Sequence, residues 1–205
     1  MSVRKSMPAA TLAALVTAAT AVGAAEAPVA ISIQPAVASA NGSVQVFGRV
    51  PTNRGDEDVS VESWVCGGYG VWIHVATVKT TSLGAWTTSA FVAATTKFRA
   101  RWRGTTSNAA TVRVRPAILL DLDRRRHLLV VVRGNDSFAH ATLQRRRGAR
   151  WVALRTITLG RDSGLGSAAD VKLRFARPTK VRLVLTARQV GRCYLPAVSD
   201  PITVP

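Results

Sequence analysis

Apolar and polar residues alternate with a period of two through most of the chain after residue 28. Val44–Arg49 and Val181–Leu185, for example, place apolar side chains at every second position. This is the pattern of a β-strand with one buried face. Turn residues such as Asn41-Gly42 and Asp162–Gly164 separate these segments at roughly 8- to 12-residue intervals. Because no later segment shows sustained helical periodicity, the pattern predicts an all-β fold.

The same series of strand-like segments occurs twice. In the first half it includes Val44–Val50, Val61–Cys66, Val71–Val75, Phe98–Trp102, Ser107 and Val112–Val114. The matching segments of the second half are Leu129–Gly134, Ala141–Arg145, Arg150–Leu154, Val181–Leu185, Ser199 and Ile202–Val204. Each half spans about 88 residues, a length typical of a duplicated domain rather than of a solenoid unit. We therefore predict two tandem antiparallel β-sandwiches, over residues 28–116 and 117–205, each with about seven strands.

This pattern resembles the bacterial immunoglobulin-like or fibronectin type III-like repeats of secreted proteins. In those repeats a V-x-V-x-G strand precedes a Trp-containing strand, a Gly turn and a late R-A or R-L strand. Val44–Gly48, Trp72, Gly84 and Arg99-Ala100 carry this likeness in the first half. The resemblance covers nearly the whole chain after residue 28. It implies an immunoglobulin-like fold and does not imply an activity.

The first 25 residues have the features of a signal peptide. Arg4 and Lys5 form a basic start, Pro8–Val22 is an almost uninterrupted run of small and apolar residues, and Ala24 and Ala25 offer cleavage positions. The alternative is a retained membrane anchor, but the apolar run is shorter than the roughly 20 residues that span a bilayer. We expect a secreted, extracellular protein without a transmembrane segment, either diffusing freely or associated with the cell wall.

The chain is strongly basic, with a formal net charge of +17. Residues 29–116 carry nine basic and four acidic side chains, whereas residues 117–205 carry 17 and six. Strand alternation predicts that Lys97 and the arginines near it point outward from one sheet, and two Arg triplets fall in turns at one end of the second domain. The candidate polyanion-binding residues are Arg99, Arg101, Arg103, Arg113, Arg115, Arg124, Arg125, Arg126, Arg145, Arg146 and Arg147. The alternative is a solvated surface that reflects an Arg-rich codon bias.

Catalytic and metal-binding patterns are not evident in the sequence. The three histidines, His74, His127 and His140, are not spaced as metal ligands, and no carboxylate pair stands in a catalytic context. We therefore predict that the protein is not an enzyme and has no cofactor and no metal site.

Three short matches have simpler explanations as turns. Gly160–Gly164 is similar to a serine-protease nucleophile loop but falls where the repeat predicts a hairpin turn. Arg54–Asp56 matches an integrin-binding tripeptide, and Asp56–Asp58 offers carboxylates for calcium. We interpret both as solvated loop residues.

Trp72, Trp102 and Trp151 fall at core-facing or repeat-matched positions, so the tryptophans do not indicate a stacking platform for bases or sugars. We do not expect sequence-specific nucleic-acid binding. The two cysteines, Cys66 and Cys193, fall one in each half, at strand ends that should face each other across the domain junction. We predict an interdomain disulfide, which requires Cα atoms within about 7 Å. Free thiols or an intermolecular bond are the alternatives.

Together these features predict a secreted, non-catalytic binding or structural module at the cell envelope. Its partner would be an anionic polymer, such as a wall teichoic acid, an acidic glycan, lipid head groups or nucleic acid. The alternative is an adhesion or assembly module that binds a protein through its sheet edges and loops.

Overall fold

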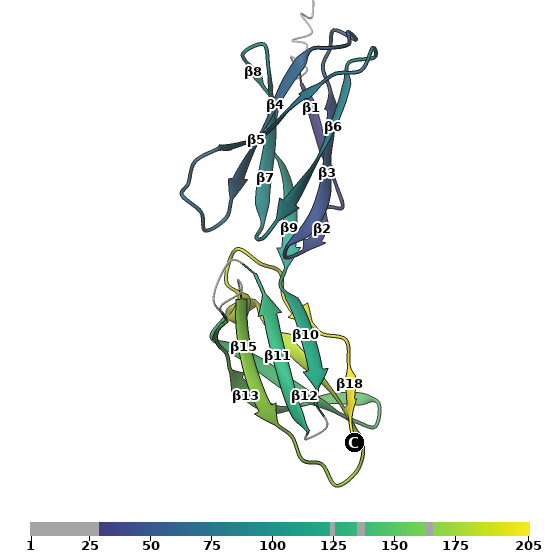
Figure 1. Ribbon diagram of the computed structural model, residues 1–205, viewed down its shortest axis with the longest axis vertical. Helices are drawn as coiled ribbons and strands as arrows, with labels where there is room; N and C mark the ends of the chain where they lie inside the picture. Colours follow the sequence, from purple (N-terminus) through teal and green to yellow (C-terminus); the bar gives the residue numbers. More distant parts are fainter. Residues whose placement is uncertain (1–28, 124–125, 135–137, 163–165) are drawn as a thin grey trace, which may run out of the picture.

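The computed structural model describes residues 29–123, 126–134, 138–162 and 166–205 (Figure 1). The predicted signal peptide, residues 1–25, lies outside these ranges, as do Arg124 and Arg125. The regular secondary structure of the described residues is almost entirely β-strand, and their single helix, α1 (Ala187–Val190), has four residues. Within these ranges no helix is both long enough and apolar enough to cross a membrane.

The N-terminal sandwich consists of two sheets built from β1 to β9. The smaller sheet has the order β1 (Ala30–Gln34), β3 (Gly42–Arg49) and β6 (Ala85–Val92), with antiparallel pairing throughout. The larger sheet has the order β2 (Val37–Ser39), β9 (Ala110–Arg115), β7 (Thr96–Trp102), β4 (Asp58–Val65) and β5 (Ile73–Lys79). A short strand, β8 (Thr105–Thr106), pairs with β7, and only the β2–β9 pair of this sheet is parallel.

The C-terminal sandwich repeats this arrangement with β10 to β18. One sheet has the order β10 (Ala117–Leu122), β11 (His127–Arg133), β15 (Gly166–Lys172) and β14 (Gly160–Asp162). The other contains β13 (Arg150–Thr158), β12 (His140–Arg147), β16 (Thr179–Leu185), β17 (Ala197–Val198) and β18 (Ile202–Val204). The predicted architecture of two tandem immunoglobulin-like β-sandwiches is thereby confirmed.

The alternating apolar side chains meet between the sheets. On β7, Phe98 and Ala100 are buried, and on β11, Leu128, Val130 and Val132 are all inaccessible to solvent. Full burial of a side chain of this size contributes about 1.5–3 kcal/mol. These residues define the inner faces of the sheets, and the residues between them point outward.

The glycine of the V-x-V-x-G motif has a packing role in the N-terminal sandwich. A Cβ atom at Gly48 would overlap both the Ala30 carbonyl oxygen and the Trp86 ring. The missing side chain lets the Trp86 indole cross from β6 into the core, where it is 2% exposed.

A buried serine is used in the same way in both sandwiches. The Ser107 hydroxyl accepts a hydrogen bond of 2.9 Å from the Ala100 N–H and donates to the carbonyl of the following residue. The Ser199 hydroxyl accepts a bond of the same length from the Leu183 N–H and also donates to the next carbonyl. Each hydroxyl thus satisfies a buried backbone N–H of the neighbouring strand, which is β7 in the first sandwich and β16 in the second.

The junction between the sandwiches is closely held. Cys66, directly after β4, forms a disulfide with Cys193, with a Cα–Cα distance of 5.4 Å, so the predicted interdomain bond is present. Beside it, the Thr95 N–H donates to the Cys193 carbonyl at 3.1 Å, and the Leu195 N–H donates to the Val114 carbonyl at 2.8 Å.

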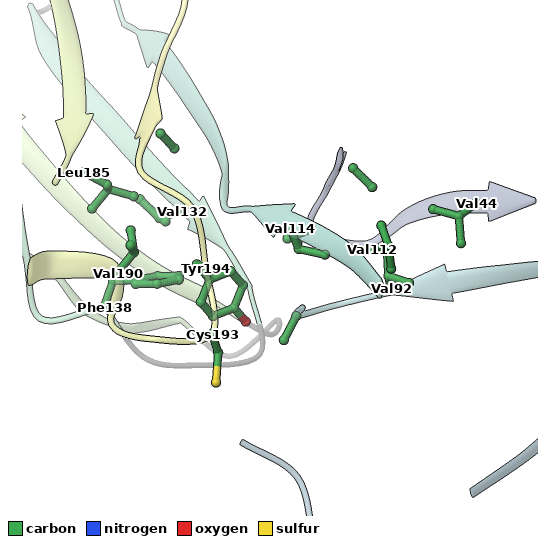
Figure 2. Close-up of a cluster of buried hydrophobic side chains, with 14 of the residues drawn as sticks. Val44, Val92, Val112, Val114, Val132, Phe138, Leu185, Val190, Cys193 and Tyr194 are labelled. Carbon is green, nitrogen blue, oxygen red and sulfur yellow. The ribbon is translucent and has the colours of Figure 1, made fainter. Parts of the chain in front are cut away.

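Buried side chains from both sandwiches continue the core through this junction (Figure 2). Val114 comes from the N-terminal sandwich, and Phe138 and Tyr194 come from the C-terminal one. The Phe138 and Tyr194 rings meet edge to face with their centroids 5.3 Å apart. The two sandwiches therefore share a packed contact rather than a free linker.

Candidate functional site

The predicted cations of the N-terminal sandwich lie on the outer face of its larger sheet. Lys97, Arg99 and Arg101 alternate with buried residues along β7, and Arg113 and Arg115 do so along β9. Arg103 follows the end of β7 in a turn and has φ +47°, so strand alternation does not determine its direction.

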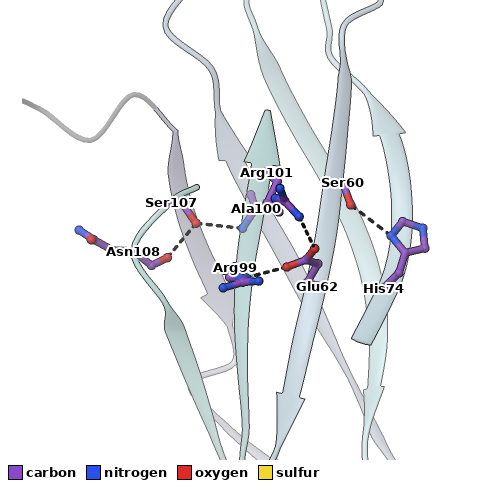
Figure 3. A network of polar contacts seen from close by, with 8 residues as sticks. All are labelled: Ser60, Glu62, His74, Arg99, Ala100, Arg101, Ser107 and Asn108. Carbon is purple, nitrogen blue, oxygen red and sulfur yellow. Dashed lines mark hydrogen bonds and ion pairs between the residues drawn. The ribbon is translucent and has the colours of Figure 1, made fainter. Parts of the chain in front are cut away.

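Three of these arginines are bound by carboxylates of the same sandwich. Arg99 Nε lies 2.6 Å from one Glu62 oxygen, and Arg101 Nη1 lies 3.4 Å from the other (Figure 3). Arg103 Nη2 lies 2.8 Å from a Glu57 oxygen. Among the described residues, no carboxylate forms an ion pair with the other members of this row, which are Lys97, Arg113 and Arg115.

Glu62 is the centre of the charged cluster on this face. Its side chain is 13% exposed, and it lies on β4 directly opposite Arg99 of β7. Burial alone would raise the pKa of Glu62, but the hydrogen bonds and positive charges of Arg99 and Arg101 outweigh it and lower the pKa below its usual value. Glu62 therefore remains ionised and holds both guanidinium groups against the sheet.

Glu57 has a similar structural role, although the sequence suggested a solvated acidic loop. Its carboxylate accepts hydrogen bonds from Trp102 Nε1 at 2.7 Å and from the Thr52 hydroxyl at 2.9 Å, in addition to the Arg103 contact. The neighbouring Asp58 pairs with Lys79 at 2.9 Å. In the described part of the chain, no three His, Cys, Asp or Glu side chains form a group that could hold a metal ion.

Two tryptophans stack on outer sheet faces instead of entering the core. The Arg99 guanidinium lies 4.2 Å from the centroid of the Trp72 ring, and in the second sandwich Arg182 lies 4.3 Å from that of Trp151. Arg182 also donates a 2.8 Å hydrogen bond to Gln144, which takes the place that Glu62 has in the first sandwich. Trp72 and Trp151 are thus matched between the repeats and half-buried, whereas Trp102 is the core-facing member of the three.

The basic turns of the C-terminal sandwich lie together at the end remote from the junction. The β10–β11 and β12–β13 hairpins are both at this end (Figure 1). We call the five described arginines of these hairpins the arginine tip; they are Arg126, Arg145, Arg146, Arg147 and Arg150. Arg124 and Arg125, also predicted here, lie outside the described residues.

The arginine tip differs from the N-terminal face in its ion pairing, although the acidic residue Asp123 lies in the β10–β11 hairpin. Arg126, Arg146 and Arg147 are exposed, and Arg145 is half-buried. Arg146 donates a 3.0 Å hydrogen bond to the Gly148 carbonyl. Among the described residues, no carboxylate forms an ion pair with any of the five arginines. Such guanidinium groups keep their donors available for phosphate or carboxylate oxygens.

The histidines are spread over three separate strands. His74 Nδ1 lies 3.1 Å from the Ser60 hydroxyl on the exposed face of the sheet (Figure 3), and His127 Nδ1 lies 3.0 Å from an Asp170 oxygen. His140 begins β12. The Ser60–His74 pair stands on an open sheet surface, so it does not form an enclosed site.

Two of the short sequence matches lie at strand connections. Arg54–Asp56 is in the loop between β3 and β4, where the Thr80 hydroxyl donates to the Arg54 carbonyl at 2.7 Å. The Gly160–Gly164 segment begins with β14, which pairs antiparallel with β15, and its Ser163 and Gly164 lie outside the described residues.

No protein-family model and no curated protein matches the sequence. Among solved structures, a cytokine receptor complex is similar at 15% sequence identity and a TM-score of 0.31, covering 86% of this chain and 94% of that chain. A human OSCAR ligand-binding domain is similar at 12% identity and a TM-score of 0.26, covering 85% of this chain and 96% of that chain. Because these TM-scores are low, the architecture is assigned from the strand pairing and not from the similarity to these structures.

Proposed function

We propose that this protein is a non-catalytic binding module outside the cell that holds an anionic polymer with its arginine tip. The observation that carries this proposal is that, within the described residues, the five arginines of the two distal hairpins form no ion pair with a carboxylate. The disulfide at the junction fits an oxidising, extracellular compartment. An anionic component of the cell wall is the partner that this location and this charge favour.

The physical basis is the neutralisation of polymer charge. A phosphate polymer concentrates counterions along its length, and each cation that replaces one of them releases it to solution. Arginine also binds two oxygens of one phosphate at once. The tip is better suited to this than the N-terminal face, because Glu62 and Glu57 already bind Arg99, Arg101 and Arg103.

The test is retention of the exported chain on immobilised poly(glycerol phosphate), with an uncharged glycan as the negative control. A tip variant, Arg126→Ser/Arg146→Ser/Arg147→Ser, removes three exposed cations without removing a buried contact. We expect the wild-type chain to be retained at low salt and released at high salt, and the tip variant to elute much earlier. Equal retention of both proteins would refute the proposed role of the tip.

A second candidate is binding of a protein partner, favoured by an exposed apolar loop beside the junction. Tyr69 is 93% exposed, Val71 56% and Ile73 49%, and they follow Cys66 closely in the chain. Exposed apolar side chains gathered in this way are typical of protein interaction sites. Binding through this loop would be insensitive to salt and would be lost in Tyr69→Ser, which distinguishes it from polymer binding.

A further inference from the structure

Strand β6 is an edge of its sheet that lacks the usual protection against pairing. Unpaired strand edges invite another strand, and proteins block them with charges, prolines, bulges or short length. β6 has eight residues, Ala85 to Val92, without a charge or a proline, and it pairs with β3 in continuous register. Nothing in its sequence or pairing therefore opposes the addition of a strand.

The other long edge strands of the described chain are each protected. β1 is followed directly by Pro35, and β10 carries the charged Asp121. β5 has Lys79 and a register shift, and β13 has Arg150, Arg155 and a register shift. The exception at β6 is thus specific to this strand.

The edge of β6 is also open to solvent. A groove of about 440 Å³ separates it from β5, with Val75 on one wall, Ala90 and Phe91 on the other and Phe98 at the inner side. The Phe91 side chain is 84% exposed. Among the described residues, no segment pairs with β6 on this side.

The second sandwich shows that this position accepts one more strand. Its sheet β10–β11–β15 matches β1–β3–β6, so β15 is the counterpart of β6. There β14 pairs with the outer edge of β15 in antiparallel register. The duplicated fold therefore carries a covering strand in one sandwich and leaves the equivalent edge open in the other.

We propose that β6 pairs antiparallel with β6 of a second copy of the chain, about a twofold axis, to form one sheet through both copies. The residues at this edge are compatible with this occupant. Two copies with a net charge of +17 repel each other over most of their surface. Along β6 and the exposed positions of β3, only Arg49 is ionisable, so two copies meet there without opposing like charges directly. This dimer is independent of polymer binding, because the arginine tip belongs to the other sandwich.

Sedimentation equilibrium of the exported chain tests the proposal. Ser89→Lys places a charge on the outward side of β6, and Ser32→Lys places the same charge on the outward side of β1, the opposite edge of that sheet. We expect a concentration-dependent dimer that Ser89→Lys weakens at least about tenfold, since each dimer would oppose two new charges, while Ser32→Lys leaves it unchanged. Thermal unfolding of each variant verifies that it is folded.

The salt dependence provides a second readout. Because the copies are alike in charge, the dimer should tighten as salt rises, the reverse of the trend expected for polymer binding. A monomer at every concentration and salt would overturn the proposal. So would a dimer that both lysine variants weaken equally, because the effect would then come from net charge rather than from the β6 edge.

Discussion

The Cα atoms of Cys66 and Cys193 lie 5.4 Å apart, although 127 positions separate the two residues in the chain. The bond joins the end of β4 in the N-terminal sandwich to the segment before β17 in the C-terminal one. Two backbone hydrogen bonds, from Thr95 to Cys193 and from Leu195 to Val114, cross the junction beside it. A fixed junction of this kind holds the arginine tip at a set distance from the N-terminal sandwich.

Removing the disulfide should loosen the junction without unfolding the sandwiches. In Cys66→Ser/Cys193→Ser we expect a loss of about 2–5 kcal/mol of unfolding free energy, because the bond closes a long loop. The remaining junction contacts are weaker, so small-angle scattering should show a broader distribution of distances. Circular dichroism should retain the β-sheet signal. An unchanged scattering profile would show that the packed contact alone fixes the junction.

The ion-paired state of Glu62 should make stability depend on pH. Since the folded state lowers the pKa of Glu62, its ionised form stabilises the protein above the unfolded pKa of about 4.3, and this stabilisation is lost as pH falls through the folded value. We expect Glu62→Gln to cost about 1–3 kcal/mol at neutral pH and progressively less below about pH 4. Denaturant unfolding of both proteins at several pH values measures this difference.

The second sandwich offers the matched control for that measurement. Gln144 occupies the place of Glu62 and receives the Arg182 guanidinium. In Gln144→Glu we expect a new contribution to stability that appears only above the pKa of the added carboxyl. If neither substitution changed the pH profile, the carboxylate–arginine pairing on these faces would be energetically neutral.

The buried serines should be needed for stability in both sandwiches. Ser107→Ala and Ser199→Ala each leave a buried backbone N–H without its acceptor, which costs about 1–3 kcal/mol. Ser43→Ala, at an exposed position of β3, is the control and should have little effect. Hydrogen exchange at the Ala100 and Leu183 amides gives a local measurement: both should exchange faster only in the corresponding variant. Unchanged exchange would mean that water replaces the hydroxyl.

The sequence alone predicts what depends on local alternation and on the repeat. Period-two patterning correctly places Phe98 and Ala100 inside β7 and Arg99 and Arg101 outside. The cysteine pairing could be anticipated because both residues stand at strand ends that face the junction.

The partners of the charged residues could not be predicted, because they depend on strand order and register. Glu62 meets Arg99 only through the β4–β7 register. Trp72 precedes β5, so strand alternation does not predict its position against Arg99 on the outer face of the sheet. The open edge of β6 likewise depends on the strand order of the sheet.

The salt dependence of polymer affinity tests the central claim most directly. The dissociation constant for poly(glycerol phosphate) would be measured between about 50 mM and 200 mM salt for wild type, for the tip variant and for a face variant, Lys97→Ser/Arg113→Ser/Arg115→Ser. Both variants lose three positive charges, so only the location differs. We predict that the tip variant binds more weakly, with a salt slope shallower by about 0.9 for each lost contact, while the face variant behaves like wild type. Equal weakening of both variants would contradict the account, because net charge rather than the arginine tip would then govern binding.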